Sequence, residues 1–382
     1  MSNKTVLSLS ALALAMASTS ASALTINDLQ DTKFTFGGYV KADLMFSNYG
    51  NGAPDSGNLS RNFYVPGTIY GVDGNAKEAI DMNVRESRFN FGTSTNVDGH
   101  EIKTLVEMDF LTTSDGNERV SNSYAPRLRH MFVSVDNWLV GQTWSTFQNP
   151  GALPEALDFV GAAEGTPFVR QTQIRYTNGG FQFAVENPEA TITAQDGSRK
   201  VSGTGSYMPD FVARYNLEAG ITKFTFAGLA RQLSYKTSTM DESVFGYAVS
   251  ATGVIQIRND TLKFGVNYGD GAGRYIALNY ANGAYQTTDG KLKSIKSVSE
   301  FVSYRHMWNE QWRSNITLSA FEADDTGIAN ANKKSMSGNV NLLYSPIKPL
   351  TVGAELFYAK NERENGTDGD LTRVIFSVKY AI

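Results

Sequence analysis

The sequence predicts an all-β fold, a 16-stranded antiparallel transmembrane β-barrel, from three observations. Apolar and polar residues alternate with a period of two from Lys33 to the last residue, Ile382. The connections between these alternating stretches are long and short in strict turn. No uninterrupted apolar run reaches the roughly 18 residues that a membrane-spanning helix needs. An even number of strands with short turns at one end and long loops at the other is typical of outer-membrane barrels.

Residues 1–23 have the pattern of a secretory signal peptide. Lys4 precedes an apolar run from Val6 to Ala17, and Ala21-Ser22-Ala23 supplies the small residues of a cleavage site. The apolar run is too short to span a membrane. We therefore expect residues 24–382 to form one exported barrel domain. The sequence contains no Cys, so its stability cannot come from disulfides, and a large closed barrel does not need them.

The first predicted strand shows the alternation clearly. Phe34 and Phe36 fall on one face and Thr35 and Lys41 on the other, as expected where one face meets lipid and the other lines water. Tight turns such as Asp98-Gly99 join neighbouring strands. The same reading predicts sixteen strands, at Lys33–Phe46, Glu86–Thr95, Ile102–Phe110, Arg127–Val135, Trp138–Phe147, Gln171–Tyr176, Phe181–Val185, Phe211–Leu217, Lys223–Arg231, Phe245–Ile257, Leu262–Tyr268, Val298–Arg305, Trp312–Leu318, Met336–Tyr344, Leu350–Tyr358 and Leu371–Ile382.

A long connection separates predicted strands five and six. It follows Gly141–Phe147 and runs from Gln148 to Pro167, which is too long for a hairpin turn. In a water-filled barrel of this size such a segment can fold inward as a constriction loop. An ordinary surface loop is the alternative, and spacing alone leaves both open. We expect Glu155, Asp158 and Glu164 on this segment to pair with basic side chains of the wall.

The charges predicted to face the lumen are mostly basic, although the whole sequence has a net charge of −4. The basic positions are Lys41, Arg88, Lys103, Arg127, Arg129, Arg175, Arg214, Lys223, Arg231, Lys263, Arg305, Arg313, Arg373 and Lys379. The acidic positions are Asp43, Glu86, Glu107, Asp109, Glu186 and Glu355. A basic lumen predicts a preference for anions, and the Arg fork can hold a carboxylate with two hydrogen bonds.

The predicted solute contacts come from this basic set. Arg88, Arg127, Arg129 and Arg305 are the leading candidates, followed by Lys41, Arg175, Arg214, Arg231 and Arg373. The alternative is that about half of these Arg residues pair with acids and only stiffen the wall. Placing Arg127 and Arg129 inward leaves His130 pointing outward or into a subunit contact, because successive strand residues face opposite sides.

Six motifs spread over most of the mature sequence share one resemblance. They are Phe36–Asp43, Arg85–Phe89, Arg127–His130, Gly141–Phe147 with Leu153-Pro154-Glu155, Gly269–Tyr275 and Tyr304–His306. Together they resemble the DcaP-like trimeric outer-membrane porins, and the Gly-Gln-Thr-Trp-Ser-Thr-Phe string is the most specific element. The sequence departs from this family in lacking an N-terminal coiled coil, which leaves periplasmic anchoring in doubt, and in ending on Ile382 instead of an aromatic residue.

The resemblance implies a homotrimer of barrels with short periplasmic turns, long external loops and a third loop folded into the pore. It implies uptake of small anionic solutes such as dicarboxylates. The partners would be these solutes together with outer-membrane lipid and lipopolysaccharide. We expect no cofactor. We also expect no metal, since Asp368 and Asp370 read better as solvated loop acids than as a weak Ca²⁺ site.

Other functional classes fit the sequence less well. The slight negative charge argues against a nucleic-acid partner. A barrel-borne hydrolase would need a nucleophile and an oriented base, yet only His100, His130 and His306 are present and no Gly-x-Ser-x-Gly motif occurs. We therefore expect no enzymatic activity. An adhesin or phage receptor built from the long loops stays open and is compatible with transport.

Overall fold

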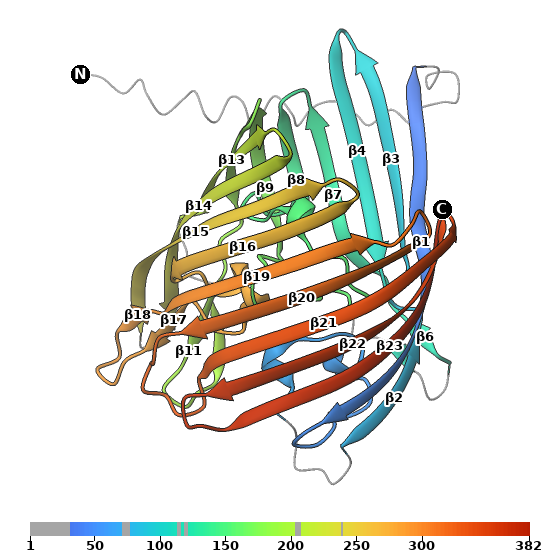
Figure 1. The fold of residues 1–382 in the computed structure, drawn as a ribbon. Coiled ribbons are helices and arrows are strands. Elements are labelled where there is room, and N and C mark those ends of the chain that lie inside the picture. The colour runs from blue at the N-terminus through green and yellow to red at the C-terminus, as the bar shows by residue number, and fades with distance from the viewer. Residues whose placement is uncertain (1–30, 71–76, 113–115, 118–120, 203–207, 238–239) are drawn as a thin grey trace, which may run out of the picture.

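The chain closes into an antiparallel β-barrel (Figure 1). The computed structural model describes residues 31–70, 77–112, 116–117, 121–202, 208–237 and 240–382. The predicted signal peptide lies outside these residues. Within them, no helix combines the length and the apolar character needed to cross a membrane.

Sixteen strands form the wall, as the sequence predicts. They are β1 (Thr32–Tyr49), the two-part strand β2 (Glu78–Asn83) and β3 (Arg88–Val97), β4 (His100–Asp109), β7 (Arg127–Val135), β8 (Trp138–Trp144), β9 (Arg170–Asn178), β10 (Phe181–Glu186), β13 (Asp210–Ala219), β14 (Thr222–Lys236), β15 (Asp241–Ile257), β16 (Asp260–Asp270), β19 (Lys296–Met307), β20 (Trp312–Ala323), β21 (Asn332–Ile347), β22 (Leu350–Arg363) and β23 (Asp368–Ala381). Each strand pairs with the next, and β23 pairs with β1 so that Lys41 lies opposite Lys379.

The second wall strand is broken, which the sequence reading did not predict. Both β2 and β3 pair with β1, through Asp43↔Asn83 and Tyr39↔Arg88. Between them the chain makes a turn in which Asn83 Oδ1 accepts from the amide of Arg85 at 3.2 Å. Side-chain hydrogen bonds to the backbone compete in this way with strand pairing. Glu86 therefore lies in the turn, not in a strand.

Short elements complete the loops. A small sheet has the order β12 (Arg199–Ser202), β11 (Ala190–Thr193), β17 (Ala284–Gln286) and β18 (Leu292–Ser294), and β5 (Gly116–Asn117) pairs with β6 (Ser123–Tyr124). The 3₁₀ turns are η2 (Leu59–Arg61), η3 (Pro66–Thr68), η4 (Pro150–Ala152), η5 (Gly273–Tyr275) and η6 (Ala277–Asn279).

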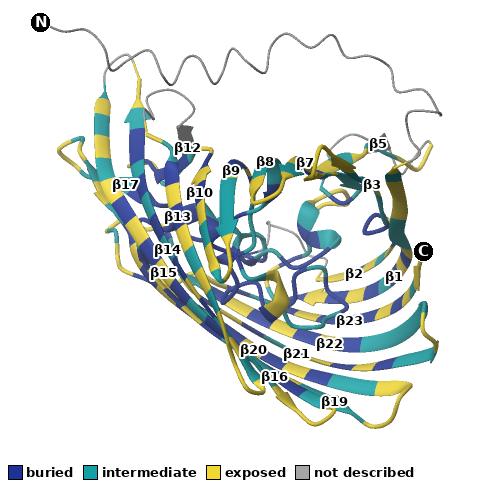
Figure 2. Cartoon of the chain, turned by 90° about the horizontal axis from the view of Figure 1, so that it is seen from above, coloured by how far each residue is buried: buried dark blue, intermediate teal, exposed yellow. Residues whose placement is uncertain are grey.

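Burial alternates along the wall strands, which Figure 2 shows as bands. On β1, Val40 is exposed on the lipid side while Lys41 and Met45 are buried inside. Loop segments lie inside the barrel (Figure 2). One apolar cluster joins Tyr64 of the first loop, Val160 of the third loop and Phe357 of the wall.

Two wall positions require glycine. Gly38 and Gly141 have φ values of +134° and +136°. A Cβ at Gly38 would lie 2.1 Å from the carbonyl oxygen of Arg88, and one at Gly141 would lie 2.3 Å from that of Met131. These contacts are far inside van der Waals distance, so both glycines are needed for neighbouring strands to approach.

Candidate functional site

The third loop, residues 145–169 between β8 and β9, runs through the barrel interior, where it contacts β13, β16 and β22. Wall side chains donate hydrogen bonds to its main-chain carbonyls. Arg214 Nη1 lies 2.8 Å from the oxygen of Gln148, and Lys263 Nζ lies 2.6 Å from that of Leu153. Because β13 is the third and β16 the sixth wall strand after β8, the loop crosses the lumen and narrows it.

Buried carboxylates hold this loop. Glu355 on β22 accepts from the amides of Leu157 at 2.8 Å and Asp158 at 3.0 Å. Asp158 Oδ2 accepts from the amide of Tyr64 at 2.8 Å and lies 3.8 Å from Arg373 Nη1. Burial raises the pKa of Asp158, although the charge of Arg373 and the backbone amides act in the opposite direction. The loop is therefore anchored at its centre to the wall and to the first loop.

The other two predicted loop acids differ in their partners. Glu155 makes a forked ion pair with Arg313, with 2.7 Å to Nη2 and 3.0 Å to Nε. Burial alone would raise the pKa of Glu155, but Arg313 and the nearby charges of Arg305 and Lys379 lower it. Glu164 instead accepts from the hydroxyls of Tyr64, Ser335 and Ser337, and burial raises its pKa. Glu155 and Asp158 thus lie beside Arg side chains, as predicted, whereas Glu164 accepts hydrogen bonds from neutral hydroxyl groups.

Four Arg residues gather where the third loop meets β3, β7 and β9, and we call Arg88, Arg127, Arg129 and Arg170 the arginine cluster. Arg127 forms a fork with Asp109, at 2.8 Å and 2.6 Å. Arg129 bridges Asp109 at 2.8 Å and Glu107 at 2.7 Å. Two acids therefore compensate these two Arg residues, and the cluster as a whole has an excess of two positive charges.

A β-bulge in β7 turns His130 toward the interior, although the sequence analysis predicted that it faces outward. Glu107 lies opposite His130 and Met108 opposite Leu128, so Arg129 is the extra residue. Arg129 and His130 are both buried inside, and His130 Nδ1 lies 3.0 Å from Thr143 Oγ1. The expectation that His130 faces outward or a subunit contact is wrong, because the bulge interrupts the alternation.

Aromatic rings lie among the Arg side chains. The guanidinium carbons of Arg88, Arg127 and Arg129 lie 5.9, 5.9 and 5.5 Å from the ring centre of Phe159, a third-loop residue. Arg170 lies 4.6 Å from the ring centre of Trp144. These distances allow cation–π attraction, which positions a cation without neutralising it.

Arg170 is a site residue that the sequence reading missed. Alternation with Thr172 and Ile174 would place it outward. However, β7 pairs with β8 only as far as Met131↔Gln142, whereas Arg170 pairs with Trp144, two residues further along β8. Arg170 therefore lies beyond the part of the wall where alternation determines whether a side chain faces the lumen or the lipid. Its position at the start of β9, directly after the third loop, is the one sequence signal that could have suggested it.

Most of the remaining predicted solute contacts bind other parts of the protein. Lys41 pairs with Glu86 and donates to the carbonyl of Leu157. Arg175 and Arg214 donate to third-loop atoms, Arg231 lies 3.3 Å from Asp210, and Arg373 is fully buried against Ser60. Arg305 differs from these, because its only side-chain hydrogen bond within the described residues goes to the hydroxyl of Thr261, at 2.8 Å.

A hydrolytic triad is poorly supported by the geometry around His130. Thr143, His130 and Glu107 lie in a row, but Glu107 Oε1 is 3.7 Å from His130 Nε2, too long to orient the ring. The same oxygen already accepts from Arg129. In the part of the chain that the structure describes, no group of three His, Cys, Asp or Glu side chains could hold a metal ion.

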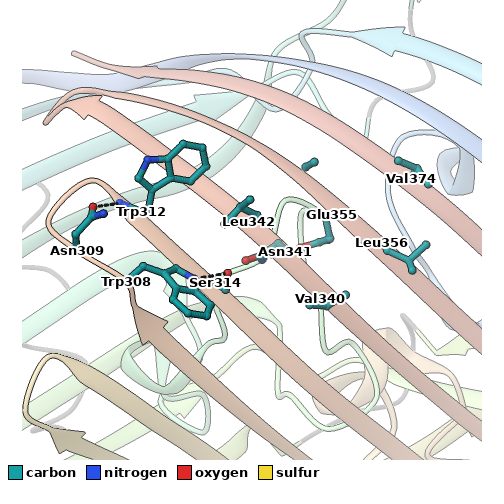
Figure 3. A pocket seen from close by; sticks show the side chains of 11 residues that line it. Trp308, Asn309, Trp312, Ser314, Val340, Asn341, Leu342, Glu355, Leu356 and Val374 are labelled. Carbon is teal, nitrogen blue, oxygen red and sulfur yellow. Dashed lines mark hydrogen bonds between the residues drawn. The ribbon is translucent and has the colours of Figure 1, made fainter.

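The outer face carries a separate groove of about 750 Å³ (Figure 3). Trp308, Trp312, Leu342 and Leu356 line it, and Trp308 Nε1 donates to Ser314 Oγ at 3.0 Å. These side chains are exposed on the lipid side of β20 to β22. The groove is apolar and lies on the outer face of the wall, so we exclude it from the solute pathway.

A closed sixteen-stranded barrel with an apolar outer face and a polar lumen defines an outer-membrane channel of the porin class. Within this class, the family model described as DcaP outer membrane protein matches residues 3–382, and the chain belongs to that family. The sequence resemblance is confirmed, and the family places the protein in the bacterial outer membrane.

Solved structures share the fold at low sequence identity. The outer membrane channel DcaP of Acinetobacter baumannii has a TM-score of 0.75 and 21% identity over 92% of this chain and 97% of that one. The anion-selective porin from Comamonas acidovorans has a TM-score of 0.58 and 10% identity over 92% and 100%. The trimer form of OmpT from Vibrio cholerae has a TM-score of 0.56 and 10% identity over 92% and 100%. None of the individually curated proteins is a significant match to the sequence.

Proposed function

We propose that this channel lets small hydrophilic solutes diffuse across the outer membrane with a preference for anions, such as dicarboxylates. The observation that carries the proposal is the excess of positive charge beside the third loop. Among the described residues, the four Arg side chains there meet only two carboxylates, Glu107 and Asp109. The loop narrows the lumen, so a passing solute comes close to these charges, where the effective dielectric constant is lower than in bulk water.

Weak binding is part of this function. A diffusion pore must release what it binds, so we expect solute affinities no tighter than roughly millimolar, about 4 kcal/mol. The preference for anions should decline as salt rises, because the Debye length is about 8 Å at physiological ionic strength and shortens further with added salt. Of the four leading candidates from the sequence, Arg88 and Arg305 are the proposed first contacts, because Arg127 and Arg129 already pair with carboxylates.

We also propose that the channel is a homotrimer. The OmpT structure described as a trimer form has the same fold, which supports this assembly. The wall from β1 to β8 together with β23 is the proposed contact face, and it carries exposed apolar side chains such as Phe36, Phe91 and Phe376. The rest of the apolar outer face would contact outer-membrane lipid and lipopolysaccharide.

Bilayer electrophysiology tests the proposed function. The purified channel is reconstituted into a planar bilayer, and the reversal potential is measured in a tenfold KCl gradient. We expect chloride to be favoured over potassium, and succinate added to one side to interrupt the current at millimolar concentration. A reversal potential that favours potassium would contradict the proposal even if the protein forms an open channel.

A further inference from the structure

We propose that Arg170, Arg88 and Lys379 select the anion and pass it along the lumen, while most other lumen cations hold loops and wall together. This inference rests on the proposed function and assigns it to particular side chains. We call these three cations, with the rings of Trp144, Phe159 and Tyr39, the cation–aromatic path.

We first exclude from the candidate solute contacts the cations that already bind other groups of the protein. Lys41, Arg127, Arg129, Arg231 and Arg313 each lie within 3.3 Å of a carboxylate oxygen, as do Lys103 and Lys223 near the short turns. Arg373 donates hydrogen bonds to Ser47, Tyr49 and Ser60. Arg175, Arg214 and Lys263 donate to atoms of the third loop. Forming a contact with a solute would cost each of these side chains a hydrogen bond or an ion pair that it already has.

The cations of the path lack such partners. Among the described residues, the side chains of Arg170 and Lys379 have neither a hydrogen bond nor an ion pair, and Arg88 has only Glu107 at 3.8 Å. Guanidinium donors left unsatisfied in this way are suited to an acceptor from outside the protein.

Aromatic rings hold these cations in place and join them in sequence. Arg170 lies over Trp144, whose ring centre is also 5.7 Å from Arg129. Arg129 and Arg88 share the ring of Phe159. Arg88 and Lys379 share the ring of Tyr39, at 4.8 Å and 5.5 Å. A ring attracts a cation without competing for its hydrogen-bond donors, so the path stays charged and free to bind.

The order of groups predicts the class of solute and how it moves. Arg170 and Arg88 each present a planar fork that fits a carboxylate, whereas Lys379 offers a point charge. A small organic carboxylate would therefore bind first at the two Arg residues. It would then transfer to Lys379, which binds a carboxylate less tightly than Arg does. Arg170 lies on β9, Arg88 on β3 and Lys379 on β23. The path therefore begins beside the third loop and ends near the C-terminal end of the last wall strand.

Single-charge substitutions test the path. Arg170→Gln, Arg88→Gln and Lys379→Gln each remove one positive charge, and Lys223→Gln is the matched control because it removes one charge from an exposed pair near a turn. We expect each path variant to lower the chloride-to-potassium permeability ratio about threefold or more. The control should leave this ratio unchanged. Arg170→Lys should keep the ratio but weaken block by succinate, because the fork is lost.

The outcomes separate this inference from the proposed function. An anion-selective wild-type channel whose ratio is unchanged in the path variants, or falls equally in Lys223→Gln, overturns the path and leaves the proposed function standing. A cation-selective wild-type channel overturns both. Assembly of each variant is checked by its heat-modifiable migration on gels. Since the Lys379 side chain has no hydrogen bond in the described residues, Lys379→Gln should assemble even if an Arg variant does not.

Discussion

Glu355 should control how firmly the third loop is held in the lumen. Its carboxylate is buried in the wall and accepts four hydrogen bonds. Two come from the loop amides of Leu157 and Asp158, at 2.8 and 3.0 Å, and two from Asn339 and Asn341, at 2.9 and 3.0 Å. Glu355→Ala removes the acceptor of all four at once and leaves the two loop amides without a partner.

The size of the effect depends on the two loop amides. A hydrogen bond to a charged group contributes about 1.5–3 kcal/mol, so losing two weakens the anchoring by about 3 kcal/mol at the low end. This shifts the equilibrium between the anchored and the displaced loop by on the order of 100-fold. The low end is appropriate because Asn339 can turn its amide oxygen toward the freed N–H groups, whereas Asn341 Oδ1 already accepts two hydrogen bonds from Asn315.

Single-channel recording in planar bilayers measures this shift. We expect Glu355→Ala to show a larger mean conductance and more frequent current fluctuations, and Glu355→Gln, which keeps one acceptor oxygen, to be intermediate. Glu322→Ala is the matched control, because that Glu is exposed and pairs only with Lys334 within the described residues. If folded Glu355→Ala channels conduct like wild type, with equally quiet currents, the anchoring role assigned to Glu355 is wrong.

Two further predictions concern the wall and the loop charge. Gly141→Ala should lower the free energy of unfolding in urea by about 2 kcal/mol or more, because its φ of +136° and the contact with Met131 exclude a side chain, whereas Gly228→Ala, with open space around it, should change it little. Glu155→Gln should raise the chloride-to-potassium permeability ratio, because it frees Arg313 from its only carboxylate partner in the described residues. The pKa of Glu155 is lowered below its usual value of about 4.3, so the ion pair is complete above that value and is lost only as pH falls through the lowered pKa. Acidifying wild type from pH 7 to pH 5 should therefore not reproduce the effect of the substitution, and an equal rise in the ratio over that range would show that Arg313 does not hold Glu155 ionised.

The alternation of residues determines most of the fold and fails where the wall is irregular. On β7 the free-energy cost of exposing Arg to lipid, added to the pattern, places Arg127 on the lumen side correctly. Alternation fails at His130 because the bulge at Arg129 adds one residue, which reverses the facing of the residues after it. It fails at Arg170 because this residue pairs with Trp144 on β8, beyond the point where β8 stops pairing with β7. The sequence does carry a signal of the bulge, because Met131 and Val133 have the same parity as Arg129 yet are apolar and exposed.

Alternation also predicts which cations face inward but not what they bind. A loop that leaves the wall and crosses the lumen carries main-chain carbonyls with no neighbouring strand, and buried carbonyls need donors. Arg214, Lys263 and Lys41 supply them at Gln148, Leu153 and Leu157. A basic wall is therefore required by an inward loop as much as by an anionic solute. Counting inward Arg residues overstates the charge available to solute, so selectivity must depend on the cations that the loops leave free.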